Sequence, residues 1–175
     1  DVFSKTVGEK YPETYDNSLP KEVVYCGGLN LTSPSTKEEI TAGKLVLSPT
    51  RTYAPIIAKI LKQYRKKIDG MIHCSGGAQT KVLHFLNDGC KVIKDNLFPI
   101  PPLFEMIQQQ SKTEWKEMYK VFNMGHRMEI YTDEQTAKEI IKISQEFGVE
   151  AQIVGRVEEG EKSVEIHSPY GKFTY

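Results

Sequence analysis

The clearest hydrophobic pattern in the chain predicts an amphipathic helix over residues 54–68. Pro55 falls in its first turn, where a missing N–H costs nothing. Lysines and arginines fill one face, and this basic face is typical of a solvated helix surface rather than a nucleic-acid site. The apolar face recurs at spacings of one, three and four residues: Ile56, Ile57, Ile60, Leu61, Tyr64 and Ile68.

A second amphipathic helix is predicted after residue 132. Thr132-Asp133-Glu134-Gln135 has the form of a capping box, and Gly148 stands where a helix would end. Its expected buried side chains are Ala137, Ile140, Ile141 and Phe147. Shorter helices are expected at 103–109 and 114–121.

Short apolar or alternating runs predict the strands. They lie at 44–48, 71–73, 90–93, 128–131, 151–157 and 163–167, with a last short strand after the turn 168–171. Glu158-Glu159-Gly160-Glu161 predicts a tight turn, so we expect the strands on either side of it to pair as a hairpin. Interleaved helices and strands that end in a hairpin indicate an α+β fold, a mixed β-sheet with helices packed on it.

The N-terminal quarter of the chain lacks such patterns. Residues 1–10 could form a frayed helix, and residues 11–43 are rich in Pro, Asn, Ser, Thr and Gly. We therefore expect an irregular arm over 1–43 and an α+β domain over 44–175. The first residue is Asp1 and not methionine, so we expect a processed start or a piece of something longer.

Composition excludes several classes of function. The chain has 175 residues, 39% hydrophobic and 26% charged, as in an ordinary globular protein. Lys plus Arg and Asp plus Glu both number 23, so there is no basic surplus for nucleic acid. The chain has no run of about 18 apolar residues, which is the length needed to cross a membrane. The three cysteines have no CxxC spacing, which favours a reduced, cytoplasmic setting.

The stretch from Gly70 to Leu86 predicts a strand, a glycine turn and a helix. The turn is Ser75-Gly76-Gly77, and the helical pattern resumes at Ala78. Backbone N–H groups at such a turn can point at one spot, where a helix dipole favours an anion. A tight structural turn is the alternative interpretation.

Metal and hydrolase sites are not expected. Histidines and cysteines are scattered without a spacing that places two on one face. His73 cannot serve Cys74 as a base, because adjacent strand residues point to opposite faces. The GxSxG elbow is absent around Ser75.

The remaining polar groups favour an anionic ligand. Thr50 and Arg51 stand between a predicted strand and a helix, where a hydroxyl and a guanidinium can bind phosphate or carboxylate. His73 could donate to an oxyanion or move a proton. Asn123 and Gly125 precede a strand in a way that lets backbone approach a ligand. Each has a structural alternative: Arg51 a surface ion pair, His73 a half-buried histidine, Asn123 a turn residue.

Three segments together resemble a known enzyme family. They are LSPTRTY at 47–53, HCSGG at 73–77 and EMYKVFNMG at 117–125. Their order and spacing are similar to those of the signature loops of the aminoimidazole ribonucleotide synthetases (phosphoribosylformylglycinamidine cyclo-ligases), PTRxY, HxTGGG and EMYxxFNxGxGM. The resemblance covers about residues 45–157, and Pro101 and Phe104 also fall where the family has a proline and an aromatic residue. Ser75, Ala78 and Arg127 depart from the patterns, replacing threonine, glycine and glycine.

The resemblance implies an activity and a missing part. Family members convert formylglycinamidine ribonucleotide and ATP to aminoimidazole ribonucleotide, ADP and phosphate. They are longer, with an N-terminal domain that supplies much of the ATP and Mg²⁺ site and the main homodimer contact. The chain would be the C-terminal domain alone, inactive by itself, and residues 1–43 would lead out of the domain junction.

The resemblance also implies roles for the residues. Backbone N–H groups of Ser75, Gly76 and Gly77 would hold a phosphate, which Thr50 and Arg51 would help to neutralise. His73 would lie near the reacting amide oxygen, and Asn123 and Gly125 would shape the floor of the site. No metal ligand is implied.

Two other classes of function stay open. Selenophosphate synthetase and thiamine-phosphate kinase share the two-domain architecture and use ATP for different chemistry, although EMYxxFNxG favours the cyclo-ligase. A non-enzymatic α+β module that binds a small molecule or a partner is the third interpretation. An acidic, glycine-rich ATP-binding domain in the parent reading frame would separate the enzymes from that module.

Overall fold

The computed structural model describes residues 2–35, 40–49 and 51–175. The chain divides into two units: one comprises residues 1–49 and Pro99–Met118, the other Thr50–Phe98 and Tyr119–Tyr175. Among the described residues, no helix is long and apolar enough to span a membrane.

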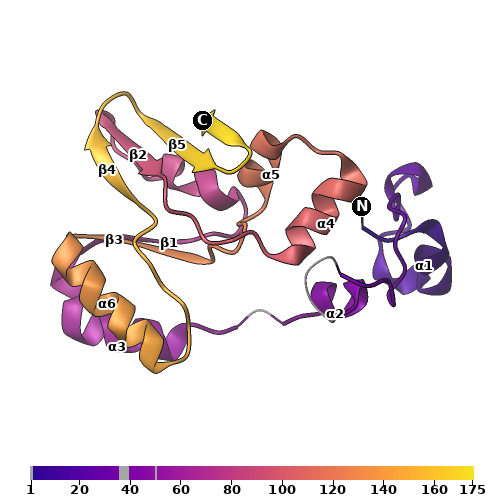
Figure 1. Cartoon of the computed structure of the whole chain (residues 1–175), viewed down its shortest axis with the longest axis horizontal. Coiled ribbons are helices and arrows are strands. Elements are labelled where there is room, and N and C mark those ends of the chain that lie inside the picture. Colours follow the sequence, from indigo (N-terminus) through magenta and orange to yellow (C-terminus); the bar gives the residue numbers. More distant parts are fainter. Residues whose placement is uncertain (1, 36–39, 50) are drawn as a thin grey trace. The chain divides into compact units, whose positions relative to one another are not determined.

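The first unit is built from short helices joined by irregular segments (Figure 1). Its N-terminal segment is joined to its helix α4 by a hydrogen bond from the Gly28 N–H to Gln110 Oε1 at 2.7 Å. The helices are α1 (Lys5–Lys10), η1 (Pro12–Thr14), η2 (Lys21–Val23), α2 (Ala42–Val46), α4 (Pro102–Ser111) and the start of α5 (Trp115–Val121).

The prediction of a strand at 44–48 is wrong, because residues 42–46 form the helix α2. The run Lys44-Leu45-Val46-Leu47 is too short for its period to distinguish a strand from one helical turn. Ala42 and Gly43 are buried in this helix, and a Cβ on Gly43 would lie 2.8 Å from the Leu31 carbonyl oxygen. Close packing of the helix start against backbone therefore decides the local structure.

In the second unit, a two-stranded antiparallel ribbon carries two helices. The strands are β1 (Ile68–His73) and β3 (Met128–Thr132). The helices α3 (Ala54–Tyr64) and α6 (Glu134–Glu146) lie side by side against one face of the ribbon (Figure 1). Their core is Ile56, Ile60, Ile140 and Ile143, with Ile68 and Ile130 of the ribbon packed against it.

Both helices differ in detail from the prediction. The first α-helix ends at Tyr64 and continues as the 3₁₀ turn η3 (Arg65–Lys67). In α6 the inward face is Ile140 and Ile143, whereas Phe147 is 43% exposed. The N-cap is Asp133 and not Thr132, and its carboxylate accepts the Thr136 N–H at 2.9 Å. Gly148 follows the helix with φ +64°, the conformation expected of a glycine stop.

The second unit also contains a four-stranded mixed sheet in the order β4-β2-β5-β6. The strands are β2 (Cys90–Lys94), β4 (Gly155–Glu159), β5 (Ser163–Ser168) and β6 (Gly171–Thr174). The predicted hairpin is wrong, because β4 and β5 both pair with β2, which lies between them. A Cβ on Gly155 would lie 1.9 Å from the Ile93 carbonyl oxygen, so glycine allows β4 to approach β2.

The predicted fold class is confirmed. Helices pack on a β ribbon, and a mixed sheet completes the second unit. The seven-residue segment Ala78–His84, expected to be α-helical, forms the 3₁₀ helix η4 and connects the ribbon to β2.

Candidate functional site

Two of the predicted loops leave the same end of the β1–β3 ribbon. The last residue of β1, His73, pairs with the first residue of β3, Met128. One step further, the Cys74 N–H donates to the Arg127 carbonyl oxygen at 2.9 Å. The turn at 75–77 follows this pair in the chain, and the turn at 123–125 precedes it. Antiparallel pairing therefore brings together two loops that are far apart in sequence.

The first loop is a tight turn with available backbone donors. The Ser75 N–H donates to the His73 carbonyl and the Ala78 N–H to the Ser75 carbonyl, both at 2.8 Å. Between them, the N–H groups of Gly76 and Gly77 have no hydrogen-bond acceptor among the described residues. These two groups are free to donate to a ligand anion.

The residue after the glycines has an unusual backbone conformation. Gly77 has φ +82° and Ala78 has φ +42°, both in the left-handed region. This region disfavours side chains with a Cβ, which gives a physical reason for a third glycine in the pattern HxTGGG. Ala78 adopts the conformation with its methyl group buried. Arg127, the other departure, is not among the positive-φ residues of the described chain.

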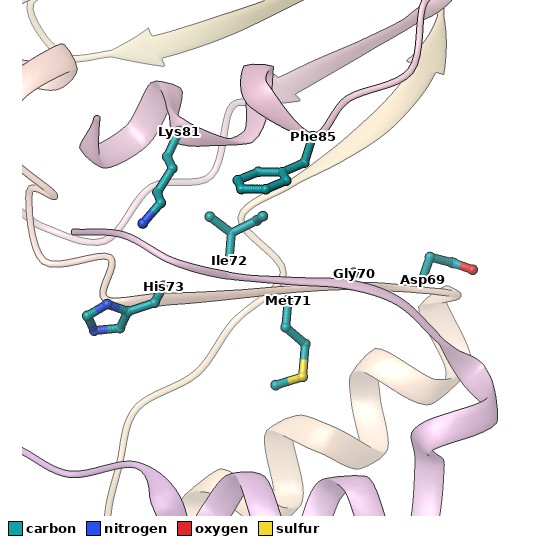
Figure 2. Close-up of a pocket in the computed structure, with 7 residues that line it drawn as sticks. All are labelled: Asp69, Gly70, Met71, Ile72, His73, Lys81 and Phe85. Carbon is teal, nitrogen blue, oxygen red and sulfur yellow. The ribbon is translucent and has the colours of Figure 1, made fainter. Parts of the chain in front are cut away.

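Lys81 is a cation of this loop that the sequence analysis missed. Its Nζ donates to Ser75 Oγ at 2.7 Å. Figure 2 shows Lys81 of η4 and Phe85, which follows η4, projecting toward β1 on the side of Ile72, whereas Met71 points to the opposite side. An open pocket of about 380 Å³ lies here, and Phe85 beside it is 65% exposed. No short-range pattern signals Lys81, because its contact depends on how the turn folds back.

The second loop is held by its own asparagine. Asn123 Oδ1 accepts the Gly125 N–H at 3.0 Å, and the Asn123 carbonyl oxygen accepts the His126 N–H at 2.9 Å. Met124 and Gly125 both have positive φ, at +51° and +94°. Asn123 is thus a turn residue here, and Gly125 occupies a conformation that suits glycine.

His73 and Cys74 point to opposite faces of the ribbon, as predicted. His73 is exposed on the same face as Met71, whereas Cys74 is 3% exposed. Burial and the nearby Glu129 carboxylate raise the pKa of the Cys74 thiol to about 12. Cys74 is therefore a protonated core residue and not a nucleophile.

The third predicted loop is not joined to the other two. Arg51 is exposed and precedes α3, and within the described residues no hydrogen bond or ion pair links it to either turn. Thr50 lies outside the described residues.

His126, next to the second loop, is a neutral core histidine. It is 2% exposed, and its Nε2 accepts the Phe98 N–H at 3.1 Å. Burial, and then the Lys94 charge, lower the pKa of His126 to about 4. The ring is uncharged near neutral pH, so it is not positioned to exchange protons there.

The donors at the end of the ribbon suit a phosphate better than a metal ion. Backbone N–H groups, the Lys81 ammonium and the Ser75 hydroxyl all favour an anion. In the described parts of the chain, no group of three or more His, Cys, Asp or Glu side chains is arranged to hold a metal. These residues therefore do not fit Mg²⁺.

Comparison with known proteins identifies the family. Residues 23–168 match the family model described as "AIR synthase related protein, C-terminal domain". The chain belongs to this family. The resemblance seen in the three motifs is thereby confirmed.

Curated relatives of this chain include proteins named phosphoribosylformylglycinamidine cyclo-ligase. The one from Alkaliphilus metalliredigens is 33% identical over 126 residues, which cover 71% of this chain and 36% of that protein. The one from Bacillus thuringiensis is 33% identical over 136 residues, 77% of this chain and 39% of that protein. The chain thus spans well under half the length of these relatives.

Solved structures show the same fold. The hydrogenase maturation protein HypE from E. coli superposes with a TM-score of 0.54 at 18% identity, covering 80% of this chain and 42% of HypE. A HypE–HypF complex gives a TM-score of 0.52 at the same identity, covering 77% of this chain. At this identity the likeness concerns the fold alone.

Proposed function

We propose that this chain is the C-terminal domain of a phosphoribosylformylglycinamidine cyclo-ligase. The reaction is the ATP-dependent closure of formylglycinamidine ribonucleotide to aminoimidazole ribonucleotide, with release of ADP and phosphate. The observation that carries the proposal is the convergence of Ser75–Gly77, Lys81 and Asn123–Gly125 at one end of the ribbon. The names of the curated relatives support the choice of reaction.

The first loop would bind a phosphate group. The N–H groups of Gly76 and Gly77 would donate to its oxygens, and the Lys81 ammonium, which donates to Ser75 Oγ, would add a positive charge. Arg51 and Thr50 would approach the same phosphate from the segment before α3. Binding by fixed donors stabilises charge with little reorganisation.

The second loop and His73 would act on the reacting part of the substrate. Asn123 and Gly125 form the floor on which the substrate rests. His73 is exposed at the end of β1, where it would donate to the amide oxygen or transfer a proton. Neither role involves Cys74 or His126, which are buried.

The remaining parts of the enzyme would come from elsewhere in a longer protein. We propose that an N-terminal domain supplies most of the site for ATP and Mg²⁺ and the homodimer contact, and that the protein works in the cytoplasm. On this proposal the present chain is inactive alone.

A related ATP-using enzyme is the second candidate. The likeness to HypE is the reason to retain this second candidate, because the same fold also occurs in a hydrogenase maturation protein. Product analysis separates the candidates, since only the cyclo-ligase forms an imidazole ring.

Two variants of the longer protein test the site. Arg51→Ala should raise the KM for formylglycinamidine ribonucleotide, and His73→Ala should lower kcat, each by about tenfold or more. Arg65→Ala and His84→Ala change exposed residues of the same types on other elements and should have little effect. Unchanged kcat and KM in both Arg51→Ala and His73→Ala would overturn the assignment.

A further inference from the structure

A buried network of charged and polar side chains, built from Lys94, Glu129, Gln79 and Tyr131, lies next to the two loops. Lys94, the last residue of β2, is 1% exposed, and Glu129 of β3 is 7% exposed. The Lys94 ammonium donates to the Gln79 carbonyl oxygen at 2.7 Å, to Gln79 Oε1 at 3.0 Å and to Glu129 Oε1. An ammonium has three donors, so these bonds satisfy all of them. Tyr131 donates to the other Glu129 oxygen, Oε2, at 2.7 Å.

Gln79 extends this network to both loops. It is fully buried and follows the turn Ser75–Gly77 by two residues. Its side-chain Nε2 donates to the Asn123 carbonyl oxygen at 2.7 Å. One side chain, oriented by Lys94, thus connects the first loop to the first residue of the second.

In this arrangement all three Lys94 donors and both Glu129 oxygens are hydrogen-bonded. A buried ammonium and a buried carboxylate are costly unless they are paired and hydrogen-bonded, so displacement of any member leaves a buried polar group unsatisfied. These hydrogen bonds hold the Gln79 side chain in place. Because Gln79 bonds to the second turn and closely follows the first, they also hold the distance between the two turns, although glycine makes each turn flexible by itself. None of Lys94, Glu129 and Gln79 is exposed to a ligand.

We infer that Gln79 is a positioning residue, held by Lys94 and Glu129, that sets the Ser75–Gly77 turn in register with the Asn123–Gly125 turn. The purpose of this register rests on the proposed function, in which both turns contact one nucleotide substrate. A shift between the turns weakens the binding of that substrate, because the phosphate and the reacting group can no longer be held together. The GGAQ sequence would then serve the site through Gln79.

The test compares Gln79→Met with a variant that is equally destabilised elsewhere. Methionine has a similar length, but it cannot donate to the Asn123 carbonyl, and its sulfur accepts only weakly from Lys94. The control is Ile143→Val or Ile143→Ala in the α3–α6 core, chosen to match the change in Tm. Amide hydrogen exchange is measured on this chain without ligand, so this arm is independent of the proposed function.

The inference predicts faster exchange in both loops at once. In Gln79→Met, the amides of Ala78, Gly125 and His126 should exchange about tenfold faster, while the control accelerates only α3 and α6. Faster exchange at Ala78 alone would overturn the inference. If Gln79→Met does not fold, Tyr131→Phe, which removes only the bond to Glu129, should produce the same pattern to a smaller extent, and no change in either loop would overturn the inference.

A second arm measures the consequence for the substrate in the longer protein. Gln79→Met should raise the KM for formylglycinamidine ribonucleotide about tenfold, and the Tm-matched Ile143 variant should leave it unchanged. Equal KM values in the two variants would overturn the positioning role. If the unmodified longer protein shows no cyclo-ligase activity, the proposed function fails, and the exchange experiment still decides whether the network couples the loops.

Discussion

Gly76 and Gly77 are neighbours in the chain but have different structural requirements. A Cβ on Gly76 would meet nothing within 4 Å, whereas Gly77 has φ +82°, which a side chain disfavours. Glycine at 77 is therefore explained by the backbone. Glycine at 76 is not required by packing, and the approach of a ligand to its N–H gives a reason for it.

The variant Gly76→Ala should separate binding from stability. We expect its free energy of unfolding to change by less than about 0.5 kcal/mol, because the added methyl group meets open space. The KM for the nucleotide in the longer protein should rise about tenfold, because the methyl group obstructs the phosphate. Gly77→Ala is the contrasting control and should cost about 1–2 kcal/mol of stability. An unchanged KM in Gly76→Ala would contradict a ligand at this turn.

His126 should make the stability of the chain depend on pH. Its pKa is about 4 when folded against an ordinary value of 6.5, so between these values the unfolded chain binds a proton that the folded chain does not. Stability from this residue is present above pH 6.5 and is lost as the pH falls toward 4, with a loss of about 2 kcal/mol at pH 5. Urea unfolding at pH 7 and pH 5 measures this loss. His126→Gln should show a smaller difference between the two pH values, and an equal difference would contradict the assignment to His126.

The sequence allowed some of these residues to be assigned and not others. The opposite directions of His73 and Cys74 followed from strand periodicity alone. Gln79, Lys94 and Glu129 looked like ordinary polar residues, because their burial depends on the packing of β2 against the ribbon. Lys81 was missed because its contact with Ser75 depends on how the turn folds back. Long-range pairing, which no local pattern encodes, determined the burial of the other three.

At the scale of elements, the long amphipathic helices were the most predictable part. The isoleucine stripe of α3 gave its inward face, since a period of 3.6 over three turns is hard to mistake. Apart from the strand expected at 44–48, which is the helix α2, the strands were found near their expected places, but the one strand pairing that was predicted is wrong. Glu158–Glu161 predicted a turn between paired strands, yet β2 lies between β4 and β5. The residues of a turn do not determine whether a strand from elsewhere in the chain pairs between the two strands that the turn connects.

The start of α6 gives a test at this scale. Asp133 Oδ1 accepts the Thr136 N–H at 2.9 Å and Oδ2 accepts the Thr136 hydroxyl at 2.7 Å. Asp133→Ala should therefore lower the free energy of unfolding by about 1 kcal/mol, and Asp133→Asn should lose less because it still caps. Gln135→Ala, which would matter only in a capping box that begins at Thr132, should change stability little. A larger effect at Gln135 than at Asp133, measured by urea unfolding, would contradict this cap.

At the scale of the whole molecule, the chain belongs to the AIR synthase related family and spans 36% and 39% of the two curated relatives compared above. The family could be inferred from three motifs, since their order and spacing are specific as a set. The division into two units, which places residues 99–118 with the N-terminal segment, could not be inferred from the sequence. Pro99 begins a proline-rich run, but such a run predicts a loop and not by itself a boundary between units, and Met118 lies inside a helix.

The most direct test of the account is product analysis with the longer protein that we propose contains this chain. The protein is supplied with formylglycinamidine ribonucleotide and ATP, and aminoimidazole ribonucleotide, ADP and phosphate are measured together. We expect the three products to form in equal amounts, and we expect Gly76→Ala to slow the formation of all three at low substrate concentration. ATP turnover without ring closure, or no turnover at all by the folded protein, would contradict the cyclo-ligase assignment.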